Sequence, residues 1–235
     1  MAIGAAIYLH TSSFYLLFLG VILVSLILTL WLKDVVREGS FQGKYTFRVL
    51  NGLRLGFILF IVSEIFFFVS FFWAFFHSSL SPSVEIGVQW PPSGISIINP
   101  FAIPLLNTAL LLSSGFTITY CHYEIINGNR FNSLYSLVIT IFLGFIFTLF
   151  QVFEYYECTF SFSDSVYGSC FFIMTGFHGF HVLVGTIFLT ICLFRLYYYH
   201  FTINRHFGFE AASWYWHFVD VVWIFLYLVV YWWGS

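Results

Sequence analysis

Charged residues are scarce in this chain. Only 8% of its 235 residues are Asp, Glu, Lys or Arg, whereas 60% are apolar and 24% are aromatic. An ordinary soluble domain carries roughly a quarter charged residues, because its surface faces water. Disorder is excluded as well, since low hydrophobicity is its signature. The composition therefore predicts that lipid surrounds most of the chain. The net charge of −2 argues against a nucleic-acid partner, which would need a basic patch.

Reactive motifs are also lacking. The four cysteines form no C-x-x-C pair and have no histidine at zinc-finger spacing, which favours an interpretation as small apolar core residues. They are Cys121, Cys158, Cys170 and Cys192. No nucleotide-binding loop, nucleophile elbow or zinc motif appears in the sequence. The residues therefore predict neither a catalytic residue nor a metal site in this chain.

Long apolar runs are what the sequence offers instead. A helix that crosses a bilayer needs about 20 mostly apolar residues. Six runs meet this requirement, at residues 12–31, 55–76, 102–121, 134–153, 167–194 and 213–233. No internal repeat and no linker separates them. We therefore expect an all-α fold, with residues 1–235 forming a single transmembrane domain built as a bundle of six helices.

All eight basic residues fall in alternate connections between these runs. Five follow the first run, one follows the third and two follow the fifth: Lys33, Arg37, Lys44, Arg48 and Arg54, then Arg130, then Arg195 and Arg205. Basic residues stay on the side from which a membrane protein is inserted. Both termini are therefore predicted to lie on the opposite, outer side.

The prolines gather in the outer connection after the second run. They are Pro82, Pro91, Pro92, Pro100 and Pro104. Because the residue before a proline favours extended or turn geometry, we expect this connection to be an ordered cap without long helices.

Glu64 lies deep inside the second apolar run. A charged group near the bilayer centre costs at least about 2.5–3.5 kcal/mol on insertion scales, so such a residue needs a partner, a proton or a function. Two interpretations stay open. Glu64 is either an acid that handles protons or a protonated structural residue that hydrogen-bonds to a neighbouring helix.

Two further polar pairs lie inside the runs. His178 and His181 belong to a G-F-H-G-F-H motif, and His217 and Asp220 lie in the last run. Both pairs have i,i+3 spacing, which places their members on one helix face. Two histidines are too few for a metal, which needs three or four ligands. We therefore expect polar contacts between helices, with His217 and Asp220 paired to each other, and we expect the two glycines of the motif to let another helix approach.

Polar residues at the ends of the runs point to the membrane surfaces. Gln151, Glu154 and Glu157 share a face at the outer end of the fourth run, where we expect them to be hydrated. On the inner side, five donors lie beside apolar helix ends: Arg37, Arg195, His200, Arg205 and His206. These donors are either a binding site for anionic lipid head groups or only a topology signal.

From the residues alone, two classes of function stay open. The chain is either a transporter or proton-conducting subunit, or a non-catalytic subunit of a larger membrane enzyme. A stand-alone transporter would show broken helices or paired repeats around a midplane site, and this sequence shows neither.

Several ordered strings resemble the cytochrome c oxidase subunit III family in its mitochondrial form. They are K-D-V-V-R-E-G-S-F-Q-G at 33–43, S-E-I-F-F-F at 63–68, F-F-W-A-F-F-H-S-S-L at 71–80, W-P-P-S-G-I at 90–95, N-P at 99–100 with I-P-L-L-N-T at 103–108, and T-G-F-H-G-F-H at 175–181. The most distinctive string is F-G-F-E-A-A-S-W-Y-W-H-F-V-D-V-V-W at 207–223. The resemblance extends over about residues 12–235.

The resemblance implies a non-redox core subunit of the terminal respiratory oxidase, complex IV, in the mitochondrial inner membrane. That complex reduces O₂ with electrons from cytochrome c and pumps protons. Haem a and copper belong to subunits I and II, so this chain is expected to bind no cofactor of its own. It is expected to pack on subunit I and on small accessory subunits. It is also expected to hold structural phospholipids, cardiolipin among them, and to support proton uptake and enzyme stability.

The resemblance also assigns residues. The buried carboxylate of the family falls on Glu64, and its lipid-contacting basic positions fall on Arg37, Arg195 and His200. The remaining polar residues of the motifs receive no metal role: they are His178, His181, His217 and Asp220.

One departure from the family is large. The family usually has seven spans, in groups of two and five that flank a lipid-filled cleft, and the match begins at the second. Either a separate polypeptide supplies the missing first helix, or the subunit has six helices only. As alternatives for the function, the chain is an equivalent subunit of a bacterial haem–copper oxidase or, less in keeping with its sequence, a stand-alone transporter.

Overall fold

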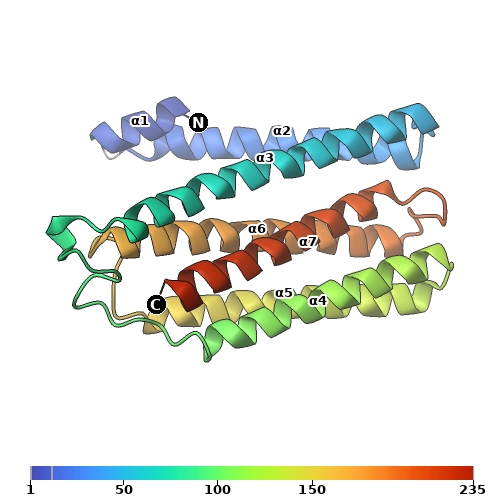
Figure 1. Ribbon diagram of the computed structural model, residues 1–235. Coiled ribbons are helices and arrows are strands. Elements are labelled where there is room, and N and C mark those ends of the chain that lie inside the picture. Colours follow the sequence, from blue (N-terminus) through green and yellow to red (C-terminus); the bar gives the residue numbers. More distant parts are fainter. Residues whose placement is uncertain (1, 12, 235) are drawn as a thin grey trace. The chain divides into compact units, whose positions relative to one another are not determined.

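The computed structural model describes residues 2–11 and 13–234, and the regular elements in this part of the chain are helices (Figure 1). They are α1 (Ala2–Thr11), α2 (Tyr15–Ser40), α3 (Phe47–Leu80), the short 3₁₀ helix η1 (Val84–Ile86), α4 (Ile103–Ile126), α5 (Arg130–Glu157), α6 (Val166–Tyr197), α7 (Phe207–Leu226) and the π-helical η2 (Tyr227–Trp233). Six helical segments, α2 to α6 and α7 with η2, are long and apolar enough to span a membrane. The predicted all-α fold with six spans is confirmed.

The observed helices are longer than the apolar runs that predicted them. For example, α3 covers Phe47–Leu80 rather than residues 55–76, and α5 covers Arg130–Glu157 rather than residues 134–153. An apolar run marks only the part of a helix that suits hydrocarbon, whereas the backbone hydrogen bonds continue into the polar flanks. The helix α1 was not predicted because its ten residues are too few for a span.

The connection from α3 to α4 is largely non-helical, as the prolines predicted. It contains the single turn η1 and otherwise turns and bends. Pro104 is the exception, because it lies in the first turn of α4 rather than in the connection. A proline fits there, since the first N–H groups of a helix have no intrahelical partner to lose.

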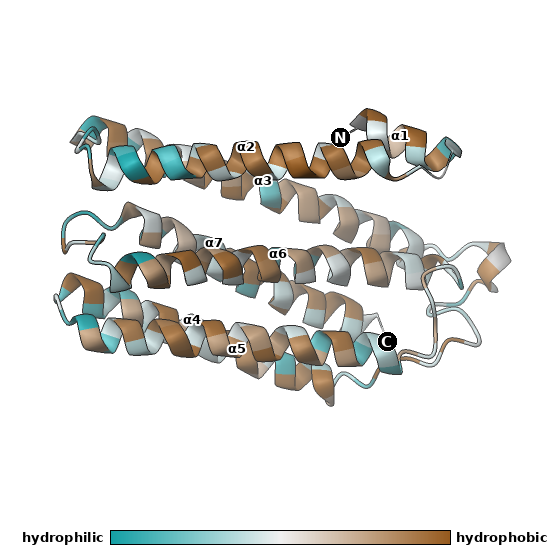
Figure 2. Cartoon of the chain, turned by 180° about the vertical axis from the view of Figure 1, so that it is seen from behind, coloured by the Kyte–Doolittle hydropathy of each residue, from teal (hydrophilic) through white to brown (hydrophobic). Residues whose placement is uncertain are grey.

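The chain forms two compact units, Met1–Gly52 and Leu53–Ser235. In the first unit, α1 packs on α2, and the Tyr45 hydroxyl donates to the carbonyl oxygen of Val35 at 3.1 Å. The second unit holds α4 to α7 and most of α3. Figure 2 shows hydrophobic residues along the middles of α2, α4, α5 and α6 and hydrophilic residues toward helix ends.

In the second unit, α4 and α6 each pack against both α5 and α7. The core between these four helices contains two buried tryptophans of α7, Trp216 and Trp223. Their indole N–H groups donate to Ser114 Oγ at 2.8 Å and to Thr108 Oγ1 at 3.0 Å, both on α4. Each tryptophan therefore fills the core with its ring while its polar group is satisfied.

Two glycines let the neighbouring helices approach Trp216. A Cβ atom on Gly144 of α5 would lie 2.6 Å from Cη2 of Trp216, and one on Gly185 of α6 would lie 3.0 Å from Cε3. The glycines expected to have this role do not have it within the described chain. A Cβ on Gly179 would meet nothing within 4 Å, and one on Gly176 would make only an ordinary contact at 3.8 Å. Spacing alone does not show which glycine faces another helix of the same chain.

Helix α3 contacts α6 and α7 through long side chains. The rings of Phe67 and Phe177 lie 5.1 Å apart, and those of Phe68 and Phe218 lie 6.0 Å apart. These aromatic contacts flank the acidic residue that the sequence singles out on α3.

Candidate functional site

Glu64 of α3 meets His181 of α6. Its Oε2 atom lies 2.8 Å from Nε2 of His181, and the two side chains are 23% and 9% exposed. The other ring nitrogen of His181, Nδ1, lies 2.7 Å from the carbonyl oxygen of Phe177 in the preceding turn. Because a carbonyl oxygen only accepts, Nδ1 of His181 must carry a hydrogen and donate it.

This tautomer restricts the proton states of the pair. If His181 is neutral, its Nε2 atom is a bare acceptor, and Glu64 must donate a proton to it. If His181 is charged, Nε2 donates and Glu64 is a carboxylate. Both states fit the same 2.8 Å contact. The pair can therefore hold one proton that either residue carries.

Aromatic rings surround the imidazole of His181. The ring centroids of Phe68, Tyr215 and Phe218 lie 5.0, 6.3 and 6.3 Å from that of His181, and the Tyr215 ring is stacked with it. Only 9% of the His181 side chain is exposed, and a low local dielectric strengthens its contact with Glu64. The site is built from α3, α6 and α7.

His178 lies one turn before His181 and is fully buried. Its Nε2 atom donates to the carbonyl oxygen of Val219 on α7 at 3.1 Å, and its ring lies against Phe147 and Trp223. This contact joins α6 to α7.

His217 and Asp220 do not pair with each other among the described contacts. Nε2 of His217 lies 3.4 Å from the hydroxyl of Thr119 on α4. Asp220 lies beside Gly115 of α4, and its buried Oδ1 atom has no hydrogen-bond partner in the described part of the chain. The expectation of a pair was wrong because both side chains lie against α4, where each of them meets Gly115 and His217 also contacts Thr119.

The basic residues assigned to lipid lie in both units. Arg37 is exposed on α2 in the first unit. Arg195 lies in the last turn of α6, with its guanidinium 4.3 Å from the centroid of the Phe201 ring and against Gly208 at the start of α7. His200 follows α6, and its backbone N–H donates to the carbonyl oxygen of Arg195 at 2.9 Å. Arg195 and His200 therefore share one end of the second unit.

Sequence reasoning missed a polar cluster at that same end. Arg54 of α3 donates two hydrogen bonds to Glu210 of α7, from Nε to Oε2 and from Nη2 to Oε1, both 2.9 Å long. Glu210 Oε1 also lies 3.4 Å from Nε2 of His206. The i,i+4 spacing of His206 and Glu210 is visible in the sequence, but Arg54 is 156 residues away from Glu210.

A second missed feature is the buried end of α5. Glu154 is 2% exposed and Gln151 is 5% exposed, so the expectation that both are hydrated was wrong, whereas Glu157 is exposed. The reason is η2, whose Tyr231 covers this end and donates to Glu154 Oε1 at 2.6 Å. Just beyond α5, burial and then the nearby Glu154 raise the pKa of Cys158 to about 11.

Comparison with known proteins identifies the family. The family model described as Cytochrome c oxidase subunit III matches residues 1–235. The chain belongs to the cytochrome c oxidase subunit III family. Curated proteins named cytochrome c oxidase subunit 3 are similar to it over its whole length. The protein from Pisaster ochraceus is 58% identical over 235 residues, which cover 100% of this chain and 90% of that protein.

Further relatives are similar to the same degree. The protein from Struthio camelus is 57% identical over 232 residues, which cover 99% of this chain and 89% of that protein. The protein from Branchiostoma lanceolatum is 56% identical over 235 residues, which cover 100% of this chain and 90% of that protein. The resemblance in the sequence motifs is thus confirmed, and the chain is a membrane-embedded core subunit of the cytochrome c oxidase complex.

Proposed function

We propose that this chain supports proton uptake and the durability of cytochrome c oxidase through Glu64 and His181. We also propose that it holds phospholipid at the end of the second unit that carries Arg195 and His200. The observation that carries the proposal is the 2.8 Å contact between Glu64 Oε2 and His181 Nε2. One proton can pass between these atoms without movement of the heavier atoms. A carboxyl group inside a membrane helix is expensive and by default functional.

The pair is placed to exchange protons. The Glu64 side chain is 23% exposed, so it is reachable from outside the chain, whereas His181 is held by Phe177 and by aromatic rings. His181 is therefore the fixed partner and Glu64 the accessible one. A proton that binds to Glu64 can be shared with His181. The pair can then release that proton without a rearrangement of the helices.

Arg195 and His200 support a phospholipid site. The guanidinium of Arg195 lies against Gly208, in the first turn of α7. A helix amino terminus carries partial positive charge, so it adds to the charge of Arg195 rather than neutralising it. Such an arrangement suits an anionic head group, cardiolipin among the candidates. We include Arg37 of the first unit as a third lipid-binding candidate.

The remaining assignments follow from the family and from charge. We place the chain in the mitochondrial inner membrane as a single transmembrane domain, with both termini on the intermembrane-space side. Its partners are subunits I and II, which carry haem a and copper, and small accessory subunits. This chain supplies no redox centre. His178 and His217 each use a ring nitrogen in a contact with another helix, in keeping with a packing role, and His181 joins α6 to α3 through Glu64.

Assembly is the first test. A tagged form of the chain, purified in mild detergent, is expected to bring subunits I and II with it and to show the absorbance of haem a. Purification of the chain alone, without haem, would overturn the assignment.

The role of Glu64 is tested with Glu64→Gln in the complex reconstituted into liposomes. Initial O₂ reduction is expected to stay close to that of the unmodified complex, because no redox centre is touched. Proton pumping, or the number of turnovers before inactivation, is expected to fall. Glu157→Gln, at an exposed position, is the control. Unchanged pumping and lifetime in Glu64→Gln would reduce Glu64 to a packing residue.

A further inference from the structure

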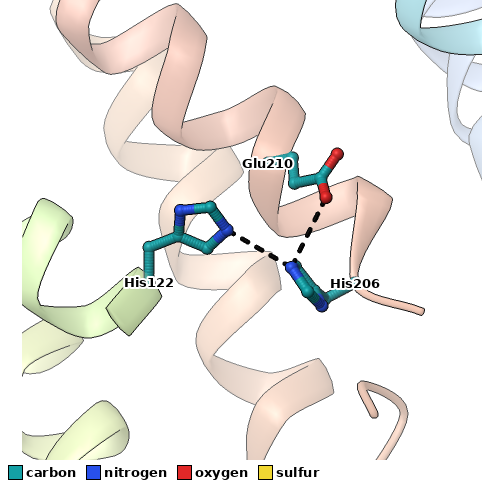
Figure 3. Close-up of side chains that lie close together, drawn as sticks. All are labelled: His122, His206 and Glu210. Atoms are coloured by element: carbon teal, nitrogen blue, oxygen red, sulfur yellow. Dashed lines mark hydrogen bonds and ion pairs between the residues drawn. The ribbon is translucent and has the colours of Figure 1, made fainter. Parts of the chain in front are cut away.

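Three side chains that can ligate a metal meet where α4 ends and α7 begins (Figure 3). His122 lies in the last turns of α4, His206 immediately precedes α7, and Glu210 lies in its first turn. Nε2 of His122 lies 3.2 Å from Nε2 of His206, which lies 3.4 Å from Glu210 Oε1. All three ligand atoms fall within 4.8 Å of one another.

These separations suit a tetrahedral zinc site. With bonds of about 2.0–2.1 Å, two ligands of a tetrahedral Zn²⁺ ion lie about 3.4 Å apart. The contacts of His206 with His122 and with Glu210, at 3.2 and 3.4 Å, already have this length. The ligand atoms of the remaining pair, His122 and Glu210, lie at most 4.8 Å apart. These two atoms would need to move closer, to about 3.4 Å, when zinc binds.

The hydrogen bonds of His206 prepare it as a ligand. Its Nδ1 atom lies 3.1 Å from the carbonyl oxygen of Thr202 and must donate to it. In the neutral imidazole, Nε2 therefore carries a lone pair and points to His122 and Glu210. Metal-binding histidines commonly have this arrangement, in which the second ring nitrogen donates to a backbone carbonyl and fixes the tautomer.

His122 needs only a tautomer change to become a ligand. Without a metal and with His206 neutral, the Nε2–H of His122 donates to the bare Nε2 of His206. A neutral imidazole can carry its hydrogen on either nitrogen. Moving that hydrogen to Nδ1 frees Nε2 of His122 for a metal, without loss of a proton from the site.

Arg54 holds the third ligand in place. Its two hydrogen bonds to Glu210 fix the carboxylate plane, as outer partners of ligating carboxylates do. The guanidinium also offsets the charge of Glu210. One neutralised carboxylate is a poor site for Ca²⁺ or Mg²⁺, which need several oxygen ligands. Two imidazoles with one carboxylate favour zinc among the divalent ions.

We propose that His122, His206 and Glu210 form a Zn²⁺ site whose fourth position stays open to water. This departs from the sequence-based prediction of no metal in the chain, and it is independent of the role given to Glu64. The bound ion would tie the end of α4 to the start of α7. His122 comes 84 residues before His206, so only the fold brings the ligands together.

Cadmium is the probe for the test, because it binds nitrogen and oxygen ligands as zinc does and can be measured separately from any zinc in the preparation. Assembled oxidase is treated with a chelator and then titrated with Cd²⁺ in equilibrium dialysis. The unmodified complex is compared with His122→Gln, His206→Gln and the control His77→Gln, whose side chain is exposed on α3. The two ligand variants are expected to bind one Cd²⁺ fewer per complex, or that ion at least about tenfold more weakly.

Equal Cd²⁺ binding by the ligand variants and the unmodified complex would overturn the proposal. If the variants do not assemble, electron microscopy of the unmodified complex with saturating Cd²⁺ gives the answer. Density for the ion between the three side chains supports the site, and its absence refutes it. Neither measurement uses O₂ reduction or haem absorbance, so its failure is distinct from failure of the proposed function.

Discussion

Glu64 of α3 and Glu154 of α5 both carry carboxyl groups on long apolar helices, and the structure gives them different partners. The Glu64 side chain is 23% exposed and contacts a histidine nitrogen at 2.8 Å. Glu154 is 2% exposed and accepts a hydrogen bond of 2.6 Å from the Tyr231 hydroxyl. The imidazole nitrogen can accept or donate in its contact, whereas the Tyr231 hydroxyl donates to Glu154.

The difference teaches that the partner, rather than depth in an apolar run, decides what a buried acid does. Glu64 contacts a base and remains partly exposed, which is why we propose a proton-exchange role for it. Glu154 anchors η2 to α5 through Tyr231 and is closed off from exchange. Its second oxygen and the Gln151 amide have no hydrogen-bond partner in the described part of the chain. The buried polar groups at this end of α5 are therefore only partly hydrogen-bonded.

Chemical labelling should separate the two acids most clearly. An apolar carbodiimide reacts with a protonated carboxyl group that it can reach from lipid. We expect it to modify Glu64 and to leave Glu154 unmodified, because only Glu64 is accessible. Mass spectrometry of peptides from the labelled complex gives the measurement, and Glu64→Gln is the control. Equal modification of both residues would contradict the contrast drawn here.

Removal of the Glu154 carboxylate should destabilise the chain. In Glu154→Ala, the buried Tyr231 hydroxyl loses its acceptor, which costs about 1–3 kcal/mol. Unfolding can be followed by maleimide labelling of the buried thiols of Cys121 and Cys192. Glu157→Ala, at an exposed position on the same helix, should be close to neutral. A Glu154→Ala chain as stable as this control would show that the contact stabilises nothing.

A double-mutant cycle sharpens the same point. Tyr231→Phe and Glu154→Gln each weaken the 2.6 Å hydrogen bond, so their combined effect should be smaller than the sum of the two. We expect a coupling energy of about 1 kcal/mol, measured by the same thiol labelling. Additive effects would mean that the two residues act independently.

The smallest expected effect concerns Cys158. Burial comes first among the causes that raise its pKa to about 11, and Glu154 comes second. Glu154→Gln removes the second cause, so the pKa of Cys158 falls and the thiolate fraction rises. Alkylation at about pH 8 should become a few-fold faster, since the thiolate is the reactive form. A rate unchanged from that of the unmodified chain would show that Glu154 exerts no charge effect on Cys158.

Some of the site could be predicted from the sequence because insertion into lipid imposes strict rules. Six apolar runs had to be helices, and a carboxyl group within one of them had to have a partner or a function. This reasoning found Glu64 and named His181 as a polar residue in another helix. It could not join the two, which are 117 residues apart.

The errors share one physical cause. Gln151 and Glu154 look hydrated because they stand at the end of an apolar run, but η2 folds over them. His217 and Asp220 look like a pair because they share a face, but both point to α4. Periodicity shows which residues share a face of a helix, and it does not show what lies opposite that face.

The sequence by itself determined that this protein is a bundle of six membrane helices of the cytochrome c oxidase subunit III family. Hydrophobic length and ordered motifs are properties of contiguous residues, so they can be read along the chain. Only the tertiary structure decided that Glu64 faces His181, that Tyr231 covers Glu154, and that His122 joins His206 and Glu210. These contacts depend on how the helices are rotated and packed, and that is set by side chains such as Trp216 fitting against Gly144.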